Sequence, residues 1–246
     1  MTAVRLAFGG SGKRVAQALP FSQRPPALLV SYAYLREFLR VRPKMHFRDW
    51  SMDSGAFSAH SLGMHIDLDA YIATCKVLLQ TDPQLSEVFS LDVIGDWKAS
   101  LRNTEKMWAA GVPAIPTFHL REPEHVLLTM AREYPKVALG GGAYYRKKDA
   151  WAEQCFARIW PHRIHGLAYG SEKSIMLLPW ESVDATNWEI GPTKYGSWKT
   201  YGNLSVRGEA LNLRVEVDHY LAVEDRARLR WAKEMKMIGA PEAVST

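Results

Sequence analysis

The sequence predicts an α/β fold, a single (β/α)8 barrel of the TIM type that spans residues 1–246. Short apolar runs alternate with segments of helical period, which is the pattern of a parallel sheet covered by helices. Eight such runs occur, and 246 residues is a usual length for one eight-stranded barrel. Since no repeat, low-complexity tract or linker interrupts the alternation, we expect one domain.

Eight segments are expected to be strands because they are short, apolar and bounded by turn residues. In chain order they are Val4–Phe8, Leu28–Tyr32, Trp50–Asp53, Val88–Val93, Ala114–Phe118, Val137–Gly140, Ile164–Ala168 and Ser182–Asp184.

Four segments between and after these strands carry the apolar spacing of helices. Pro123 is typical of a first helical turn, and Gly111 and Gly239 are typical of the position just after a helix. The expected helices are 67–80, 98–110, 123–134 and about 224–238. The longest stretch without periodicity, about 185–207, directly follows the eighth strand and is expected to be a functional loop.

Positive charge is concentrated near the N-terminus. Residues 1–48 carry nine basic side chains against Glu37 alone, a formal net charge of +8 that leaves −3 for the rest of the chain. Such a segment is typical of a protein that binds a phosphate backbone, although a solvated surface would look the same. The nine are Arg5, Lys13, Arg14, Arg24, Arg36, Arg40, Arg42, Lys44 and Arg48.

The two cysteines, Cys75 and Cys155, lie far apart and form no metal-binding motif. We therefore expect reduced thiols, no disulfide framework and no bound zinc. The sequence contains no run of about 18 apolar residues and no signal-peptide pattern. A soluble, cytoplasmic protein without membrane contact or cofactor is expected.

The polar residues that end the predicted strands are the candidates for chemistry, because barrel active sites form at the carboxyl ends of the strands. Asp53, Asp92 and Asp184 end the third, fourth and eighth strands, and His119 follows the fifth. Three converging carboxylates would perturb each other's pKa values and favour acid–base or nucleophilic roles. For each aspartate alone, capping of the next helix is the alternative.

The segment Gly9–Arg14 resembles a nucleotide-binding P-loop, but Ala7 stands where that motif needs glycine, and Arg14 follows the lysine where it needs serine or threonine. We interpret it as a basic loop whose Lys13 and Arg14 touch nucleic-acid phosphates. The other side chains expected to contact a nucleic-acid backbone are Arg146, Lys147, Lys148, Lys194 and Lys199. For Arg146, Lys147 and Lys148, a surface cluster at the start of a helix is the alternative. The aromatic candidates to stack on a flat base are Phe57, Tyr144, Tyr145, Tyr169 and Trp188.

Five ordered motifs give the chain a family resemblance. They are DSGAF at 53–57, LD at 91–92, LGGG at 139–142, HGLAYG at 165–170 and SVDAT at 182–186. Together they resemble the tRNA-guanine transglycosylase superfamily, and in particular its small phage-type members, which act as DNA 7-deazaguanine transglycosylases.

The resemblance implies a role for each matching position. Asp184 matches the nucleophile that attacks the sugar C1′ and forms a covalent glycosyl-enzyme. Asp53 matches the carboxylate that moves protons, and Asp92 matches the acid that binds the edge of a guanine-type base. The other implied base-site residues are Ser54, Gly140, Gly141 and His119, the last standing where the family often has glutamine.

One departure bears on the substrate. The tRNA enzymes of this family hold zinc through three cysteines and a histidine after the eighth strand, and this chain has no cysteine beyond Cys155. DNA is therefore favoured over tRNA as the nucleic-acid partner. The resemblance further implies a 7-deazaguanine base such as 7-cyano-7-deazaguanine (preQ0) as the incoming substrate.

Two other functions stay open from the sequence. One is a (β/α)8 hydrolase or lyase that uses Asp53 and Asp92 on a small phosphorylated substrate. The other is a non-catalytic nucleic-acid-binding subunit of the same fold. A homodimer or an accessory subunit is compatible with each.

Overall fold

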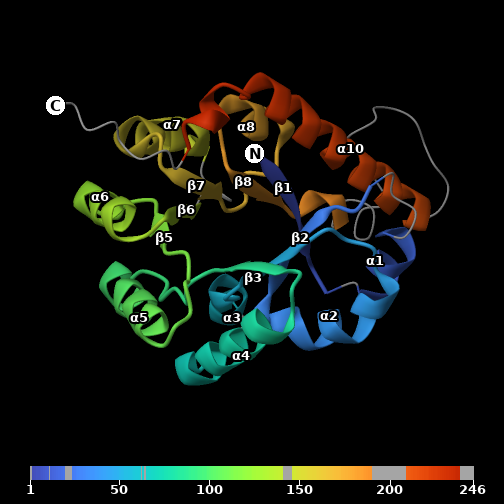
Figure 1. Ribbon diagram of the computed structural model, residues 1–246, viewed down its shortest axis with the longest axis horizontal. Helices are drawn as coiled ribbons and strands as arrows, with labels where there is room; N and C mark the ends of the chain where they lie inside the picture. Colours follow the sequence, from blue (N-terminus) through green and yellow to red (C-terminus); the bar gives the residue numbers. More distant parts are fainter. Residues whose placement is uncertain are drawn as a thin grey trace.

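The computed structural model describes residues 2–10, 12–19, 24–61, 63, 65–140, 146–189 and 209–238. These residues form one eight-stranded sheet with the order β4-β3-β2-β1-β8-β7-β6-β5, and every paired ladder is parallel (Figure 1). The predicted parallel α/β class is thereby confirmed. The strands are β1 (Ala3–Phe8), β2 (Ala27–Ser31), β3 (Trp50–Asp53), β4 (Leu85–Val88), β5 (Thr117–His119), β6 (Lys136–Gly140), β7 (Arg163–Gly166) and β8 (Ser182–Ala185).

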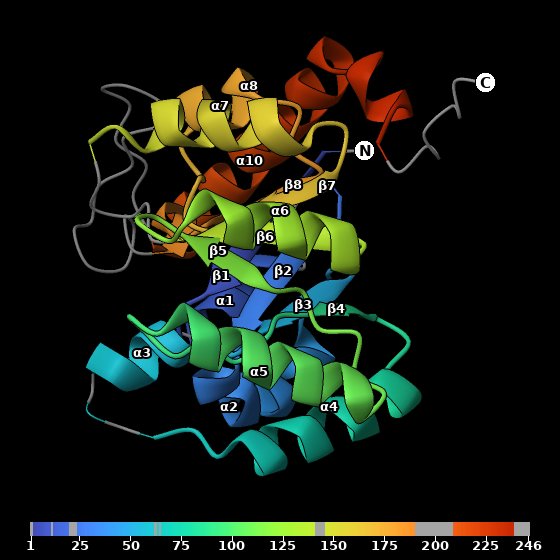
Figure 2. The ribbon, with the colours of Figure 1, turned by 90° about the vertical axis from the view of Figure 1, so that its left-hand side faces the viewer.

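The sheet is strongly curled, with its helices on the outside, as in a TIM barrel (Figures 1 and 2). Its two outermost strands, β4 and β5, are joined by one isolated parallel bridge between Phe89 and Ile115. These two side chains also pack with Leu29 and Ala138, which come from β2 and β6. Side chains from strands distant in the sheet order therefore meet on its inner face.

The helices follow the strands as the sequence predicts over most of the chain. They are α1 (Gly12–Ala18), α2 (Leu35–Val41), α3 (Ala56–Ser61), α4 (Leu68–Thr81), α5 (Trp97–Ala109), α6 (Glu124–Glu133), α7 (Lys148–Ile159), α8 (Glu172–Leu177) and α10 (Glu209–Arg230), with 3-10 turns η2 (Tyr32–Tyr34), η3 (Arg42–Lys44) and η4 (Glu234–Lys236). No helix in these described segments is long and apolar enough to cross a membrane.

The predicted helices 67–80, 98–110 and 123–134 are confirmed as α4, α5 and α6. Asp67 and Asp96 cap the first two by accepting the N–H groups of Ala70 and Ala99. The prediction of a last helix at 224–238 is wrong in its bounds, because α10 starts at Glu209 and ends at Arg230.

Two predicted strands are also displaced. The fourth was expected at Val88–Val93 and lies at Leu85–Val88. This segment looks polar in the sequence, but Glu87 pairs with Lys136 and Arg5, and these ion pairs allow it to stand in the sheet. The fifth was expected at Ala114–Phe118 and begins at Thr117. Pro116 has no N–H to donate, which limits the ladder on its side.

The sheet encloses a layer of paired charges at the end where its strands begin. The buried Arg5 guanidinium lies 2.6 Å from Asp49, and the buried Lys136 ammonium lies 2.7 Å from Glu87 and 3.0 Å from Glu181. Burial works against ionisation of Glu87, but the charges of Lys136 and Arg5 outweigh it and lower its pKa from 4.5 to about 2. Ion pairs therefore stabilise the end of the sheet where the strands begin.

Candidate active site

The carboxyl ends of the strands, which we call the mouth, carry Asp53 at the end of β3. Its Oδ2 accepts the N–H of Gly55 at 3.0 Å, and Gly55 has a φ of +76° in a turn where a Cβ would lie 2.7 Å from the Ser31 hydroxyl. Burial, with the charges of Asp92 and Asp184 adding to it, raises the pKa of Asp53 from 3.8 to about 7 despite the Gly55 N–H. Asp53 can thus give or take a proton near neutral pH.

Asp184 lies across the mouth on β8 and is 5% exposed. Its Oδ1 accepts the N–H of Ala168, a residue with a φ of +61°, at 2.7 Å. The loop that carries Ala168 is pressed against β8, since a Cβ on Gly170 would lie 2.4 Å from the Cα of Ala185. The loop after β7 therefore fixes Asp184. The N–H that Asp184 accepts belongs to this loop and not to the segment after β8.

A buried histidine lies next to Asp184. His165 on β7 makes a 2.7 Å hydrogen bond through Nδ1 with the Ser182 hydroxyl, and its Nε2 is 3.6 Å from Asp184 Oδ1. Burial, together with the charge of Lys136, lowers its pKa, so the ring is neutral at neutral pH. This histidine opens the HGLAYG motif, from which no role could be predicted for it.

Asp92 follows β4 and pairs with His119 at the end of β5. His119 Nε2 is 3.4 Å from Asp92 Oδ2, while Nδ1 is 3.2 Å from Glu122 Oε1. Burial disfavours the charged ring, but its hydrogen bonds to both carboxylates outweigh this and raise the pKa of His119 to about 10. The other Asp92 oxygen, Oδ1, is buried and has no hydrogen-bond partner among the described residues.

A pocket of about 450 Å³ opens beside Asp92. It lies between α3, the segment before α4 and the segment after β4. Its lining includes Ala56, His60, Ile66, Leu91, Asp92 and Asn103. Because a carboxylate is among its lining residues, the pocket suits a small ligand with N–H donors.

Gly140 lies against His119, where a Cβ would come 3.0 Å from its Cδ2 and 2.7 Å from the Thr117 methyl. Glycine is needed here to make room for the imidazole. Asp53, Asp92, Asp184, His119 and Gly140 are thus the predicted site residues that the structure brings to the mouth.

Other predicted site residues lie elsewhere. Tyr169 is fully buried against Trp180 with its ring centroid 4.7 Å away, so the expectation that it stacks on a base conflicts with its place in the core. Ser54 is also buried, and its hydroxyl accepts the Ala56 N–H at the start of α3. Trp188 is also buried and donates its indole N–H to the Ala7 carbonyl, which conflicts with the expectation that it stacks on a base. Phe57 is 61% exposed on α3, and Tyr144 and Tyr145 lie outside the described residues.

Several of the N-terminal basic residues are paired inside the protein. Arg5 pairs with Asp49, Arg24 with Asp225, Arg42 with Asp82 and Arg48 with Glu224. The charge count of this segment therefore overstates what is available to a phosphate backbone. Lys13, Arg36, Arg40 and Lys44 are exposed.

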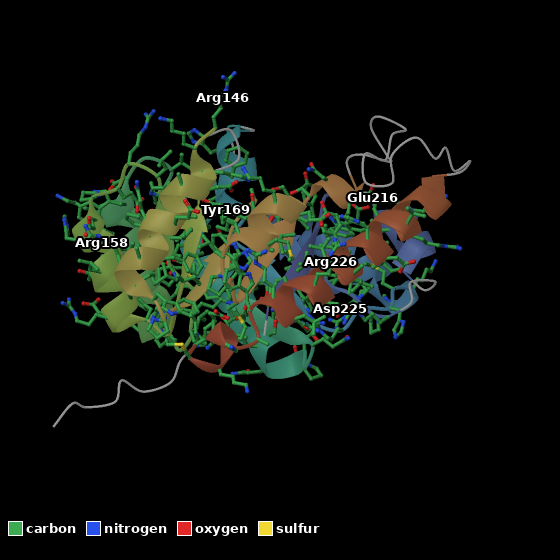
Figure 3. The ribbon with its side chains drawn as sticks, turned by 90° about the horizontal axis from the view of Figure 1, so that it is seen from above. Arg146, Arg158, Tyr169, Glu216, Asp225 and Arg226 are labelled. Carbon is green, nitrogen blue, oxygen red and sulfur yellow. The ribbon has the colours of Figure 1, made fainter. Side chains whose placement is uncertain are left out.

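The basic residues after β6 are divided in the same way. Arg146 and Lys147 are exposed, and Figure 3 shows Arg146 projecting away from the ribbon. Lys148 turns inward, donating to the Ala168 carbonyl at 2.6 Å and lying over the Tyr169 ring. Its pKa is lowered by burial, against the charges of Asp149 and Asp184. Gly141, Lys194, Lys199 and the Arg14 side chain lie outside what the structure describes.

The glycine loop after β1 is bound by carboxylates of the protein itself. The Gly9 N–H donates to Glu189 at 2.7 Å and the Gly12 N–H donates to Glu37 at 3.0 Å. These amides are not open to a nucleotide phosphate, in agreement with the interpretation that the loop is not a P-loop. Over the described ranges, no group of three metal-ligating side chains is found.

The sequence matches no known protein family and no curated protein. Among solved structures, a putative fructose-1,6-bisphosphate aldolase from Coccidioides immitis superimposes with a TM-score of 0.56 at 11% identity, over 93% of this chain and 92% of the other. A thiamine phosphate pyrophosphorylase from Bacteroides thetaiotaomicron gives 0.42 at 10% identity, over 92% and 98%. The first likeness supports a TIM-barrel-type fold of the kind that enzymes use, and it carries no activity over to this chain.

Proposed function

We propose that this protein exchanges a guanine base in a nucleic acid for a 7-deazaguanine base, with Asp184 as the attacking carboxylate. The observation that carries the proposal is the pairing of two carboxyl groups at the mouth in different environments. Burial and the charges of Asp92 and Asp184 raise the pKa of Asp53 to about 7, whereas Asp184 accepts the Ala168 N–H and faces the His165 ring. One group suits proton transfer and the other suits attack on an anomeric carbon.

The reaction proceeds in two steps that use the same two residues. Asp184 Oδ2 attacks the sugar C1′, the C1′–N9 bond breaks, and the Asp53 proton goes to the departing guanine. Asp53 then takes a proton from the incoming base, whose nitrogen attacks C1′ and releases Asp184. The free Oδ1 of Asp92 accepts N–H groups from the base edge, and the pocket beside Asp92 receives the base.

We infer that the sheet closes into a barrel at the Phe89–Ile115 bridge, so that all three carboxylates share one mouth. The Coulomb contributions of Asp92 and Asp184 to the pKa of Asp53 support this convergence.

DNA is the nucleic acid we propose as substrate. The support is three exposed basic side chains that follow the carboxyl ends of strands. Lys13 lies in α1, after β1, and Arg146 and Lys147 directly precede α7, after β6. Binding should weaken with salt, because each phosphate that is neutralised releases counterions. Efficient exchange of labelled guanine into tRNA, with none into DNA, would contradict this assignment.

The covalent step can be tested by trapping. Wild-type protein mixed with DNA and no incoming base should give a slower band on a denaturing gel, and Asp184→Ala should give none. Glu133→Ala, at an exposed carboxylate on α6 paired with Arg132, is the matched control. A band that persists in Asp184→Ala and vanishes in Asp53→Ala would reverse the two roles, and no exchange or band with any nucleic acid would refute the proposed function.

A further inference from the structure

The turn after β5 folds back on itself so that Glu122 lies against His119. One oxygen of Glu122 accepts the backbone N–H of His119 at 3.0 Å, and the other faces its ring Nδ1 at 3.2 Å. The turn is closed by the Glu122 N–H, which donates to the His119 carbonyl at 3.1 Å. Arg121, between them, adopts a φ of +78°, which is a strained value for a residue with a side chain. The chain therefore accepts backbone strain to place this carboxylate.

The His119 ring is constrained on its other sides as well. Its Nε2 faces Asp92, and Gly140 of the adjacent strand β6 lies so close to the ring that a Cβ there would come 3.0 Å from its Cδ2. Among the described residues, Asp92 and Glu122 are the charged groups that act on the ring. Because the ring is held as an imidazolium, both nitrogens donate, one to each carboxylate.

This arrangement gives the two oxygens of Asp92 different surroundings. Oδ2 faces His119, while Oδ1 is buried and has no hydrogen-bond partner among the described residues, and Asp92 is one of the residues that line the pocket. A buried carboxylate oxygen that is left unpaired costs free energy, and a ligand N–H would recover it.

We propose that Glu122 is a positioning residue for base recognition: it fixes the His119 ring, which holds one oxygen of Asp92 and leaves the other free to accept an N–H of the base. The choice of base as ligand rests on the proposed function. The contact chain Glu122–His119–Asp92 stands on the geometry alone. Glu122 itself touches no part of the base in this scheme.

The test compares Glu122→Gln and Glu122→Ala with Glu124→Gln as the matched control. Glu124 lies two residues further on, at the start of α6, and pairs with the exposed Arg158. The first measurement is the pKa of His119 by NMR titration of its ring. Loss of one carboxylate partner should lower it by about one to three units in both Glu122 variants, and Glu124→Gln should leave it unchanged.

The second measurement is the binding of radiolabelled guanine by equilibrium dialysis. Affinity should fall roughly tenfold or more in Glu122→Ala and less in Glu122→Gln, whose amide oxygen can still accept a hydrogen bond from the ring. A structural role would lower stability in both variants without this graded recovery.

The outcomes separate the two proposals. An unchanged His119 pKa in Glu122→Gln, or unchanged guanine affinity in Glu122→Ala, overturns the positioning role. If wild-type protein binds no guanine while the His119 pKa still falls in the variants, the contact chain stands and the proposed function, with guanine as the ligand, is overturned.

Discussion

Asp53 should make the stability of the protein depend on pH in a defined direction. Its pKa rises from 3.8 in the unfolded chain to about 7 in the folded protein. Between these values the folded state keeps a proton that the unfolded chain has released, so the free energy of unfolding falls as pH rises. The contribution of Asp53 is fully present below the lower value and is lost as pH rises through the upper one.

The size of the effect follows from the shift. A rise from 3.8 to about 7 corresponds to about 4 kcal/mol, and solvent screening at the partly exposed side chain reduces this to about 2–3 kcal/mol. Asp53→Asn keeps an oxygen that can accept the Gly55 N–H but cannot ionise. Relative to wild type, the variant should therefore gain about 2–3 kcal/mol between about pH 4 and about pH 8.

Urea denaturation at intervals across this pH range measures the difference directly, because other titrating groups cancel between variant and wild type. Asp69→Asn removes an exposed carboxylate whose pair with Lys106 lies at the surface, and it should change stability by less than about 1 kcal/mol throughout. A difference between Asp53→Asn and wild type that stays constant over the whole range would refute the raised pKa and, with it, the acid–base role of Asp53.

Three further outcomes follow from the structure. Gly170→Ala puts a Cβ 2.4 Å from the Ala185 Cα, so the melting temperature should fall by an amount that reflects about 2–4 kcal/mol; an unchanged melting curve would contradict the close packing. Lys136→Met removes the cation nearest to Glu87, leaves Arg5 as its remaining close partner, and should cost about 3 kcal/mol in urea. That stability exists above pH 4.5 and is lost as pH falls towards about 2, so equal loss at every pH would argue against the pair. Asp92→Asn should weaken guanine binding about tenfold without weakening DNA binding, and unchanged base selectivity would make Asp92 a structural residue.

Much of the sheet could be predicted because the spacing of apolar residues can be read within a short stretch of sequence. Strand β4 shows where that signal fails. The segment Leu85–Val88 looks too polar for a buried strand, since Glu87 finds its partners Arg5 and Lys136 more than forty residues away in either direction. A short stretch of sequence around β4 contains Glu87 but not its partners, so the strand was predicted at the apolar residues that follow.

The candidate site shows the same division. Asp53, Asp92 and Asp184 were predictable because each lies at or shortly after the carboxyl end of a strand, and parallel strands bring these ends together. Glu122 was missed because it acts through a turn with a positive φ at Arg121, for which the sequence has no marker. The burial of Tyr169 was not foreseen either, because it depends on packing against Trp180, a residue from another loop.

The layer of paired charges beneath the mouth has a thermal consequence. The cost of removing ions from water falls as temperature rises, whereas hydrophobic stabilisation levels off. The pairs of Arg5 with Asp49 and of Lys136 with Glu87 should therefore supply a growing share of the total stability as the protein is heated. Heating should therefore weaken the apolar contacts between the sheet and the outer helices before it weakens the ion pairs at the end where the strands begin. That end of the carboxylate-bearing strands should be the last part to lose its native geometry.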